Sequence, residues 1–363
     1  MKIGIDCREI TKHTTGIARF LLSFLGNVRV YTNEYEFILF GNQYTDFSRR
    51  ELDGYKKIQI YERNTLYFDQ IQLLNAINQY KIDLFFSPYY KFPIFSKIPI
   101  VTTIFDVMYL VLKEYRNSLK SKWIKNFIKL FYNKVSKVIT GSNAAKNDII
   151  KICGLPEDKV EVIYLAVDKK FNPQSSQRIQ EVKQKYGLTK KYILYVGNSN
   201  HHKNLNRLIE AYSLLPEKIK NEYQLVLAGV KNQHMITTLL PDTGYLLLMI
   251  PYVLEEDLSS LYSGAEIFVF PSLYEGFGLP PLEAMACGCP VVSSNTSSLP
   301  EILKDAAIYF NPYDILDIKN TLERTILDID LKNELKQKGT KRIEDFSLEK
   351  MILNLLKVLN IER

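Results

Sequence analysis

Two glutamates, Glu275 and Glu283, carry the strongest chemical signal in the chain. An apolar run ends at Phe270, and Gly276 and Gly278 separate the two acidic residues before a pair of prolines. This order predicts a strand, a glycine loop and a helix, because proline suits the first helical turn. Carboxylates accept paired hydrogen bonds from vicinal hydroxyls, and amides at a helix start bind anions. The string therefore predicts a site for a sugar or a ribose phosphate, although two isolated glutamates would more simply be solvated surface residues.

The neighbouring residues make the string specific. From Pro271 the chain reads PSLYEGFGLPPLEAMA, then CGCPVVSSN, and it reaches Ser298-Leu-Pro-Glu301. This resembles the signature of retaining glycosyltransferase family 4, the group 1 glycosyl transferases. The resemblance implies a GT-B fold, with two Rossmann-like doubly wound α/β domains facing a cleft. It also implies transfer of a hexose from a nucleotide sugar to an acceptor hydroxyl, without a metal or any cofactor other than that co-substrate.

The resemblance also implies roles for single residues. Glu275 would contact the hydroxyls of the donor sugar, and Glu283 would bind the nucleotide ribose. Amides near Gly278 would hold sugar and phosphate. The donor-binding residues expected in this string are Ser272, Glu275, Gly276, Phe277, Gly278, Leu279 and Glu283.

A second loop follows the expected strand Tyr192–Val196 and resembles the glycine and Lys-Asn segment of the family. Its expected donor-binding residues are Gly197, Asn198, His202 and Lys203. Lys203 is expected to be catalytic together with Glu275, since a fixed cation stabilises charge on a leaving phosphate. Many relatives have an arginine near Asn198 or His202, so we expect a weaker or protonation-sensitive phosphate clamp. Adjacent histidines seldom chelate one ion, and we predict no metal.

The first half of the chain carries one residue expected near the donor phosphate and two expected near the acceptor. Gly16 opens a predicted helix in a Gly-Ile-x-Arg string, which resembles relatives that use GDP-mannose. Gly16 is expected to meet the donor phosphate, and a plain loop glycine is the alternative. Phe105 and Asp106 stand where the family usually has His-Asp. Because phenylalanine shares no proton, either the enzyme works without the histidine or its activity is impaired.

Alternating apolar runs and helical stretches predict the elements that must position these residues. The expected domains are residues 1–170, which bind the acceptor, 171–345, which bind the nucleotide sugar, and a C-terminal helix in 346–363 that packs back on the first domain. The expected strands are Ile3–Ile5, Phe37–Phe40, Leu84–Phe86, Ile100–Ile104, Lys137–Thr140, Tyr192–Val196, Gln224–Ala228, Leu246–Ile250, Ile267–Phe270 and Pro290–Ser293.

The composition of the chain bears on where the protein is located and which surfaces it can bind. The chain has 363 residues and a net charge of +7. Residues 1–170 hold 26 Lys and Arg against 17 Asp and Glu, a charge of +9, whereas residues 171–363 hold 21 against 23, a charge of −2. No apolar segment follows the first residues, so we expect a cytoplasmic protein. Lysines and aromatic residues alternate between Ser118 and Val138, which allows docking on an anionic inner membrane surface, although such a stripe is more often domain core.

Three other functions fit the sequence less well. A nucleic-acid-binding protein would fit the basic half, but the chain lacks a recognisable helix-turn-helix, zinc or RNA-binding motif, and we expect no nucleic acid partner. A nicotinamide dehydrogenase would need G-x-G-x-x-G, which the first strand and helix lack. A non-catalytic GT-B subunit that binds a nucleotide sugar or a protein partner remains the alternative, because of Phe105. The predicted function is glycan, polysaccharide or glycolipid synthesis from a nucleotide sugar, with mannose from GDP-mannose as the favoured donor, onto a glycan or lipid-linked acceptor.

Overall fold

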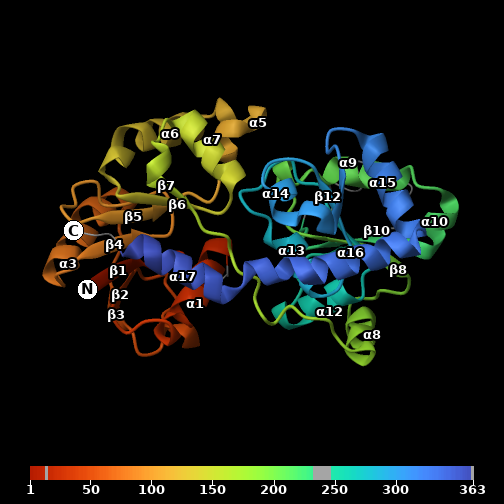
Figure 1. Ribbon diagram of the computed structural model, residues 1–363, viewed down its shortest axis with the longest axis horizontal. Coiled ribbons are helices and arrows are strands. Elements are labelled where there is room, and N and C mark those ends of the chain that lie inside the picture. Colours follow the sequence, from red (N-terminus) through yellow and green to blue (C-terminus); the bar gives the residue numbers. More distant parts are fainter. Residues whose placement is uncertain (13–14, 232–246, 361–363) are drawn as a thin grey trace. The chain divides into compact units, whose positions relative to one another are not determined.

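The computed structural model describes residues 1–12, 15–231 and 247–360 (Figure 1). Its contacts divide the chain into two compact units. Unit 1 comprises residues 1–166 together with the segment that begins at Leu348, and unit 2 comprises Val167–Ser347. Residues 246 and 361, which the sequence placed in a strand and in the C-terminal helix, lie outside the described residues.

Unit 1 is built around a parallel sheet whose described strands run in the order β3-β2-β1-β4-β5-β6-β7. The strands are β1 (Lys2–Asp6), β2 (Glu36–Gly41), β3 (Lys56–Gln59), β4 (Leu84–Ser87), β5 (Ile100–Thr103), β6 (Lys137–Thr140) and β7 (Val160–Val162). The helices are α1 (Gly16–Leu25), α2 (Thr65–Tyr67), the π-helix η3 (Phe68–Gln72), α3 (Leu73–Gln79), α4 (Met108–Val111), α5 (Lys113–Arg116), α6 (Leu119–Phe131), α7 (Asn143–Cys153) and α17 (Leu348–Leu359).

Unit 2 repeats this design with the strand order β10-β9-β8-β11-β12-β13 in its described part. The strands are β8 (Lys191–Val196), β9 (Tyr223–Ala228), β10 (Leu247–Ile250), β11 (Ile267–Phe270), β12 (Val291–Ser294) and β13 (Ala307–Phe310). The helices are α8 (Ser176–Lys185), the 3-10 turn η6 (His201–Lys203), α9 (Leu205–Ser213), α10 (Glu217–Glu222), α12 (Leu258–Ser263), α13 (Leu279–Ala286), α14 (Leu299–Leu303), α15 (Ile315–Leu327) and α16 (Ile329–Arg342).

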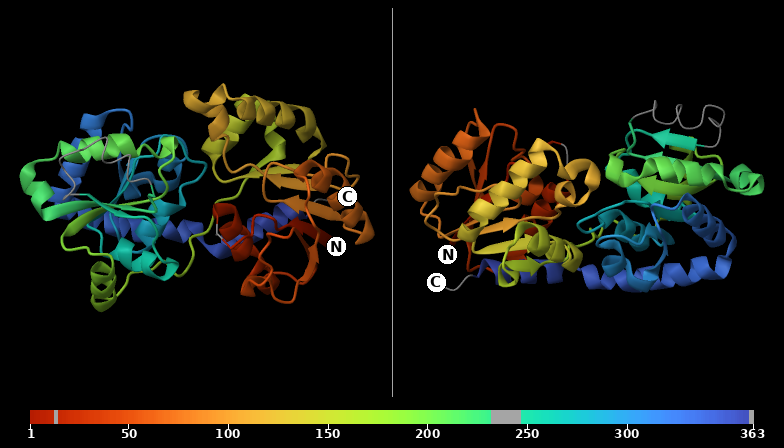
Figure 2. Two further views of the ribbon diagram at one scale, coloured as in Figure 1. Left: turned by 180° about the vertical axis from the view of Figure 1, so that it is seen from behind. Right: turned by 90° about the horizontal axis from the view of Figure 1, so that it is seen from above.

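Helices cover both faces of each sheet, as Figure 2 shows, so the central strands are apolar along their whole length. All four residues of β11 are fully buried, for example, and so are those of β4. This confirms the predicted fold class of two Rossmann-like, doubly wound α/β units. Within unit 1, α17 packs on α1, and its buried side chains include Ile352 and Leu355.

The strand order fixes where ligands are expected in each unit. The order reverses between β1 and β4 in unit 1 and between β8 and β11 in unit 2. In open parallel sheets, the loops that leave the carboxyl ends of the two strands at such a point diverge and form a ligand-binding crevice. In unit 2 these loops are the two that the sequence marked as donor-binding.

Candidate functional site

The centre of the unit 2 site is an ion pair between the two loops. Lys203 ends η6, after β8, and Glu275 lies in the loop after β11. The Lys203 Nζ is 2.6 Å from Glu275 Oε1, and the two side chains are 13% and 16% exposed. Lys203 Nζ also lies 5.1 Å from the centre of the Phe270 ring, at the end of β11. The structure thus brings together the two residues that the sequence predicted as catalytic, although 72 positions separate them.

Asn204 joins three loops at this edge of the sheet. Its side chain is buried, and its Nδ2 donates to the backbone oxygen of Pro271 at 3.1 Å and to that of Pro312 at 2.7 Å. These acceptors follow β11 and β13, whereas Asn204 itself follows β8. Its φ of 58° is left-handed, a conformation that asparagine adopts more readily than most residues. A second link, from the Leu273 amide to the His202 carbonyl at 2.7 Å, closes the same junction.

The glycine loop before α13 is shaped by one left-handed residue. Gly278 has a φ of 102°, a conformation that residues with a side chain rarely adopt, and a Cβ there would also lie 2.7 Å from Leu299 Cδ2, so glycine is strongly favoured. The Ser298 hydroxyl lies 2.9 Å from the carbonyl oxygens of both Glu275 and Phe277. These two contacts anchor the glycine loop to the start of α14. Leu279 then begins α13, with prolines in its first turn as predicted.

Two buried polar atoms at this site have no hydrogen-bond partner among the described residues. They are the Ser272 Oγ, in the loop after β11, and the His202 Nδ1 in η6. A buried polar atom without a partner is costly, so such atoms mark places where a ligand or a water completes the bonding. Both residues were predicted to bind the donor.

His202 is neutral in this setting. Burial, followed by the neighbouring charge of Lys203, lowers the pKa of its imidazole to about 4. The imidazole therefore carries no charge at neutral pH. The expectation that protonation of His202 would tune the phosphate clamp near pH 7 is not favoured by this environment.

The remaining predicted donor residues are placed as follows. Glu283 lies on α13, is 4% exposed and accepts a hydrogen bond from the Tyr262 hydroxyl at 3.0 Å. Asn198 is exposed, and its carbonyl accepts from the Tyr195 hydroxyl at 2.7 Å. Gly197 is packed so tightly that a Cβ would lie 2.5 Å from that hydroxyl oxygen. Gly276 and Phe277 are buried in the loop between Glu275 and Gly278.

Unit 1 holds the predicted acceptor-side residues Phe105 and Asp106, and it also holds Gly16, which was predicted to meet the donor phosphate. Gly16 is the first residue of α1 and is exposed, and an added Cβ would meet no atom within 4 Å. Phe105 packs edge-on against Phe20 of α1, with ring centres 5.4 Å apart. Asp106 is exposed and accepts a hydrogen bond from the Met108 amide at the start of α4. The aromatic contact gives Phe105 a packing role at the position where the family resemblance led us to expect a histidine.

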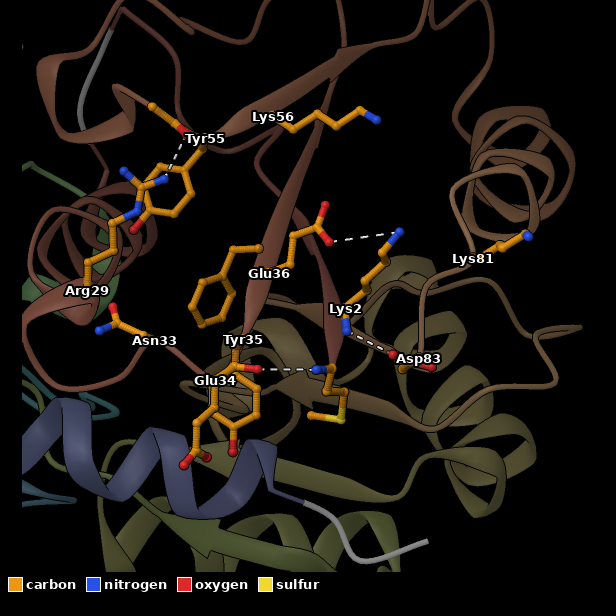
Figure 3. A pocket seen from close by; sticks show the side chains of 13 residues that line it. Lys2, Arg29, Asn33, Glu34, Tyr35, Glu36, Tyr55, Lys56, Lys81 and Asp83 are labelled. Atoms are coloured by element: carbon orange, nitrogen blue, oxygen red, sulfur yellow. Dashed lines mark hydrogen bonds and ion pairs between the residues drawn. The ribbon is translucent and has the colours of Figure 1, made fainter.

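A pocket of about 800 Å³ in unit 1 lies at the amino ends of β1, β2 and β3 (Figure 3). Its lining includes Lys2 and Glu36, at the amino ends of β1 and β2, which form an ion pair at 3.8 Å. Arg29 donates to the carbonyl oxygens of Asp53 and Gly54 at the same pocket. Because it sits at the edge opposite to the carboxyl ends of the strands, this pocket is not a candidate for the transfer site.

Among residues 1–12, 15–231 and 247–360, no group of three or more His, Cys, Asp or Glu side chains is arranged to hold a metal ion. Within the same residues, no helix has the length and apolarity that crossing a membrane requires.

Sequence reasoning missed the role of Asn204 and a buried network around Arg8 in unit 1. The Lys-Asn string contains the only available signal for Asn204, because asparagine is over-represented at left-handed positions. Nothing in the sequence shows that its amide reaches loops 67 and 108 positions away. Arg8 directly follows the first strand, but its partner Asp69 is 61 positions away, so no local pattern connects the two.

The fold and the loops of unit 2 define a GT-B glycosyltransferase. Two family models match the chain, "Glycosyltransferase Family 4" over residues 10–171 and "Glycosyl transferases group 1" over residues 176–342. The chain belongs to this glycosyltransferase family and is a glycosyltransferase.

Relatives and solved structures agree with this. The chain is 29% identical to O-antigen chain mannosyltransferase B of Escherichia coli, over 96% of this chain and 97% of that protein. It is 35% identical to the serotype-specific mannosyltransferase WbdA of Escherichia coli over 61% of this chain, which is only 29% of that longer protein. The structure of WaaG, a glycosyltransferase involved in lipopolysaccharide biosynthesis, superimposes with a TM-score of 0.79 at 16% identity, covering 99% of this chain and 100% of that one.

Replacing Asn204 by aspartate should destabilise unit 2. The variant keeps the side-chain shape but turns both N–H donors into an oxygen that faces the Pro271 and Pro312 carbonyls. Leaving two buried acceptors unsatisfied costs about 2–4 kcal/mol in total. Thermal unfolding should show a fall of several degrees. Asn200→Asp, at an exposed position of the same loop, is the control, and equal melting temperatures for the two variants would contradict this role.

His202 should make the protein less stable in mild acid. Its pKa is about 4 in the folded chain and about 6.5 when unfolded, so the unfolded state binds more protons as the pH falls. Its contribution is therefore complete above pH 6.5 and is lost between pH 6.5 and 4. Denaturant unfolding at pH 7.5 and 5.0 should show a smaller difference for His202→Gln than for the wild type. An unchanged difference would show that other groups titrate instead.

Proposed function

We propose that the protein transfers mannose, from GDP-mannose, to a sugar hydroxyl of a growing surface polysaccharide such as an O-antigen chain, with retention at the anomeric carbon and without a metal. The observation that carries the donor part is the Lys203–Glu275 pair at the switch point of unit 2. The mannosyl part is supported by the names of the two Escherichia coli relatives.

The ion pair supplies the charge that donor cleavage needs. When the bond from the sugar C1 to the phosphate oxygen breaks, negative charge develops on the leaving diphosphate. Lys203 lies in a part-buried site where a fixed cation is worth several kcal/mol to such a transition state. A diphosphate that engages Lys203 competes with Glu275 for the ammonium group, and the freed carboxylate then accepts the sugar hydroxyls.

Retention is proposed through a front-face route. The C1–phosphate bond breaks, the acceptor oxygen forms a bond to C1 from the same face, and the acceptor proton passes to the departing diphosphate oxygen. The protein then contributes position and charge. The carboxylate nearest to the proposed sugar site, Glu275, is already engaged by Lys203, which favours a binding role for it over that of a nucleophile.

Unit 1 is proposed to bring the protein to an anionic membrane surface through α6. The helix buries Ile124 and Ile128 in the core, while Leu119 and Leu130 are 86% and 67% exposed. Trp123 is 52% exposed and stacks on Phe127. Lys122, Lys125 and Lys129 lie at exposed positions on the same helix. Exposed apolar side chains between lysines suit an interface with anionic lipid.

The donor should be identified by ligand-induced stabilisation. We expect GDP-mannose to raise the melting temperature more than UDP-, ADP- and dTDP-sugars, because a ligand that binds only the folded state stabilises it. Lys203→Ala should abolish the shift and lower transfer about 100-fold or more, and Glu275→Ala should lose discrimination between sugars. NMR of the product should show the α-anomer. No response to any donor would favour a non-catalytic subunit, and an inverted anomer would exclude the retaining route.

The proposed contact of α6 with the membrane should be tested with two matched double variants. Leu119→Ser with Leu130→Ser should reduce co-sedimentation with vesicles that contain anionic lipid about tenfold, since each removes exposed apolar surface. Leu316→Ser with Leu327→Ser, at positions of α15 that are 62% and 65% exposed, should leave it unchanged. Wild-type protein that stays in the supernatant at low salt would overturn the proposal.

A further inference from the structure

A guanidinium is buried at the switch point of unit 1. Arg8 follows β1 and is 8% exposed. Its Nε and Nη2 donate to the Asp6 carboxylate, with the shortest bond at 2.7 Å, and Nη2 also donates to Asp69 Oδ1 of η3 at 2.6 Å. These bonds fix one edge of the guanidinium between the end of β1 and the π-helix.

Aromatic rings hold the plane of the same group. The Arg8 Cζ lies 4.2 Å from the centre of the Phe68 ring and 5.5 Å from that of Tyr89, which follows β4. The Tyr89 hydroxyl donates to Asp6 Oδ2 at 3.2 Å. Both strands that flank the switch point therefore contribute to the network, and the orientation of Arg8 is fixed before any ligand binds.

The other edge of the guanidinium has unused hydrogen-bonding capacity. Arg8 Nη1 makes no hydrogen bond to the described residues, and Glu62 Oε2, its ion-pair partner, is 3.7 Å away, beyond hydrogen-bond reach. Glu62 is itself held by the Asn42 amide at 2.6 Å and the Thr65 hydroxyl at 2.7 Å. Nη1, a rigidly held hydrogen-bond donor, thus faces the rigidly held carboxylate of Glu62 at a distance longer than a hydrogen bond.

We propose that Arg8 and Glu62 together bind one hydroxyl of the acceptor's terminal sugar. A hydroxyl can accept from Nη1 and donate to the Glu62 carboxylate at the same time, which no purely accepting or purely donating group can do. This inference rests on the proposed function and names the chemical class of its acceptor. Arg8 and Glu62 are binding residues here, and Asp6 and Asp69 are positioning residues.

The charge at this edge selects a neutral acceptor. Asp6, Glu9, Glu62 and Asp69 give four acidic groups against Arg8 and Lys91, a sum of −2. Burial raises the pKa of Asp69 to about 6, so this carboxyl is ionised at pH 7.5. The charge of Arg8 is already offset by its carboxylate partners, and an added phosphate would meet a surplus of negative charge. The sugar that binds here is therefore uncharged.

The test compares two probes, methyl α-D-mannopyranoside and the same sugar phosphorylated on its 6-hydroxyl. Saturation-transfer NMR on the full chain without donor should detect the neutral probe and not the phosphorylated one. In transfer assays, Glu62→Gln and Arg8→Lys should each raise the KM for the neutral acceptor at least tenfold and leave the donor KM within twofold. Glu161→Gln, which removes an ion pair with Lys137 at the surface of unit 1, is the control.

The outcomes separate this proposal from the proposed function. A wild type that binds neither probe, or that prefers the phosphorylated one, overturns the acceptor class. Unchanged acceptor KM in both variants shows that the network is only structural, and so does an equal loss of acceptor binding, donor binding and melting temperature. Failure of every nucleotide sugar to stabilise the wild type would instead reject the proposed function, whatever the NMR experiment shows.

Discussion

The geometry of the loops at the switch point of unit 2 depends on the side-chain amide of Asn204. Loops that leave parallel strands diverge, and each carries backbone carbonyls that its own strand no longer satisfies. Asn204 satisfies two of these carbonyls, after β11 and after β13, from a residue after β8. The left-handed backbone of Asn204 turns the chain from η6 into α9, so Lys203 is carried on the same fixed junction. The distance between Lys203 and Glu275 follows from this arrangement.

The ion pair has a physical consequence for how a donor could bind. A part-buried lysine or glutamate alone would be costly, and pairing the two removes most of that cost. In the proposed reaction the donor's diphosphate would replace the Glu275 carboxylate as the partner of Lys203, and the sugar hydroxyls would compensate Glu275 in the same event. Nucleotide and sugar would then be recognised together, and a free sugar without diphosphate would leave Lys203 and Glu275 paired with each other.

Patterns local in sequence predicted much of this molecule, and long-range contacts did not appear in them. The fold class and the central strands follow from apolar runs, because strands covered on both faces must be apolar throughout. Strands β3, β7 and β13 were missed because each lies at the edge of its sheet and is only partly buried, and β3 also begins with two lysines. The loop string identified Glu275 and Lys203 as candidates, but only the tertiary structure shows that they form one ion pair. The same limit hid the Arg8–Asp69 contact.

The surplus charge of the first half of the chain can now be assigned to a surface. The switch point of unit 1 sums to −2, so the +9 of residues 1–170 must come from elsewhere in that segment. Exposed lysines of α6 account for a part of it, beside exposed Leu119 and Leu130. An enzyme that bound a phosphorylated acceptor at this switch point would need positive charge there. Here the switch point is acidic, although the first half of the chain as a whole is basic. This combination suits a protein that approaches an anionic surface through one face and binds uncharged sugar at another.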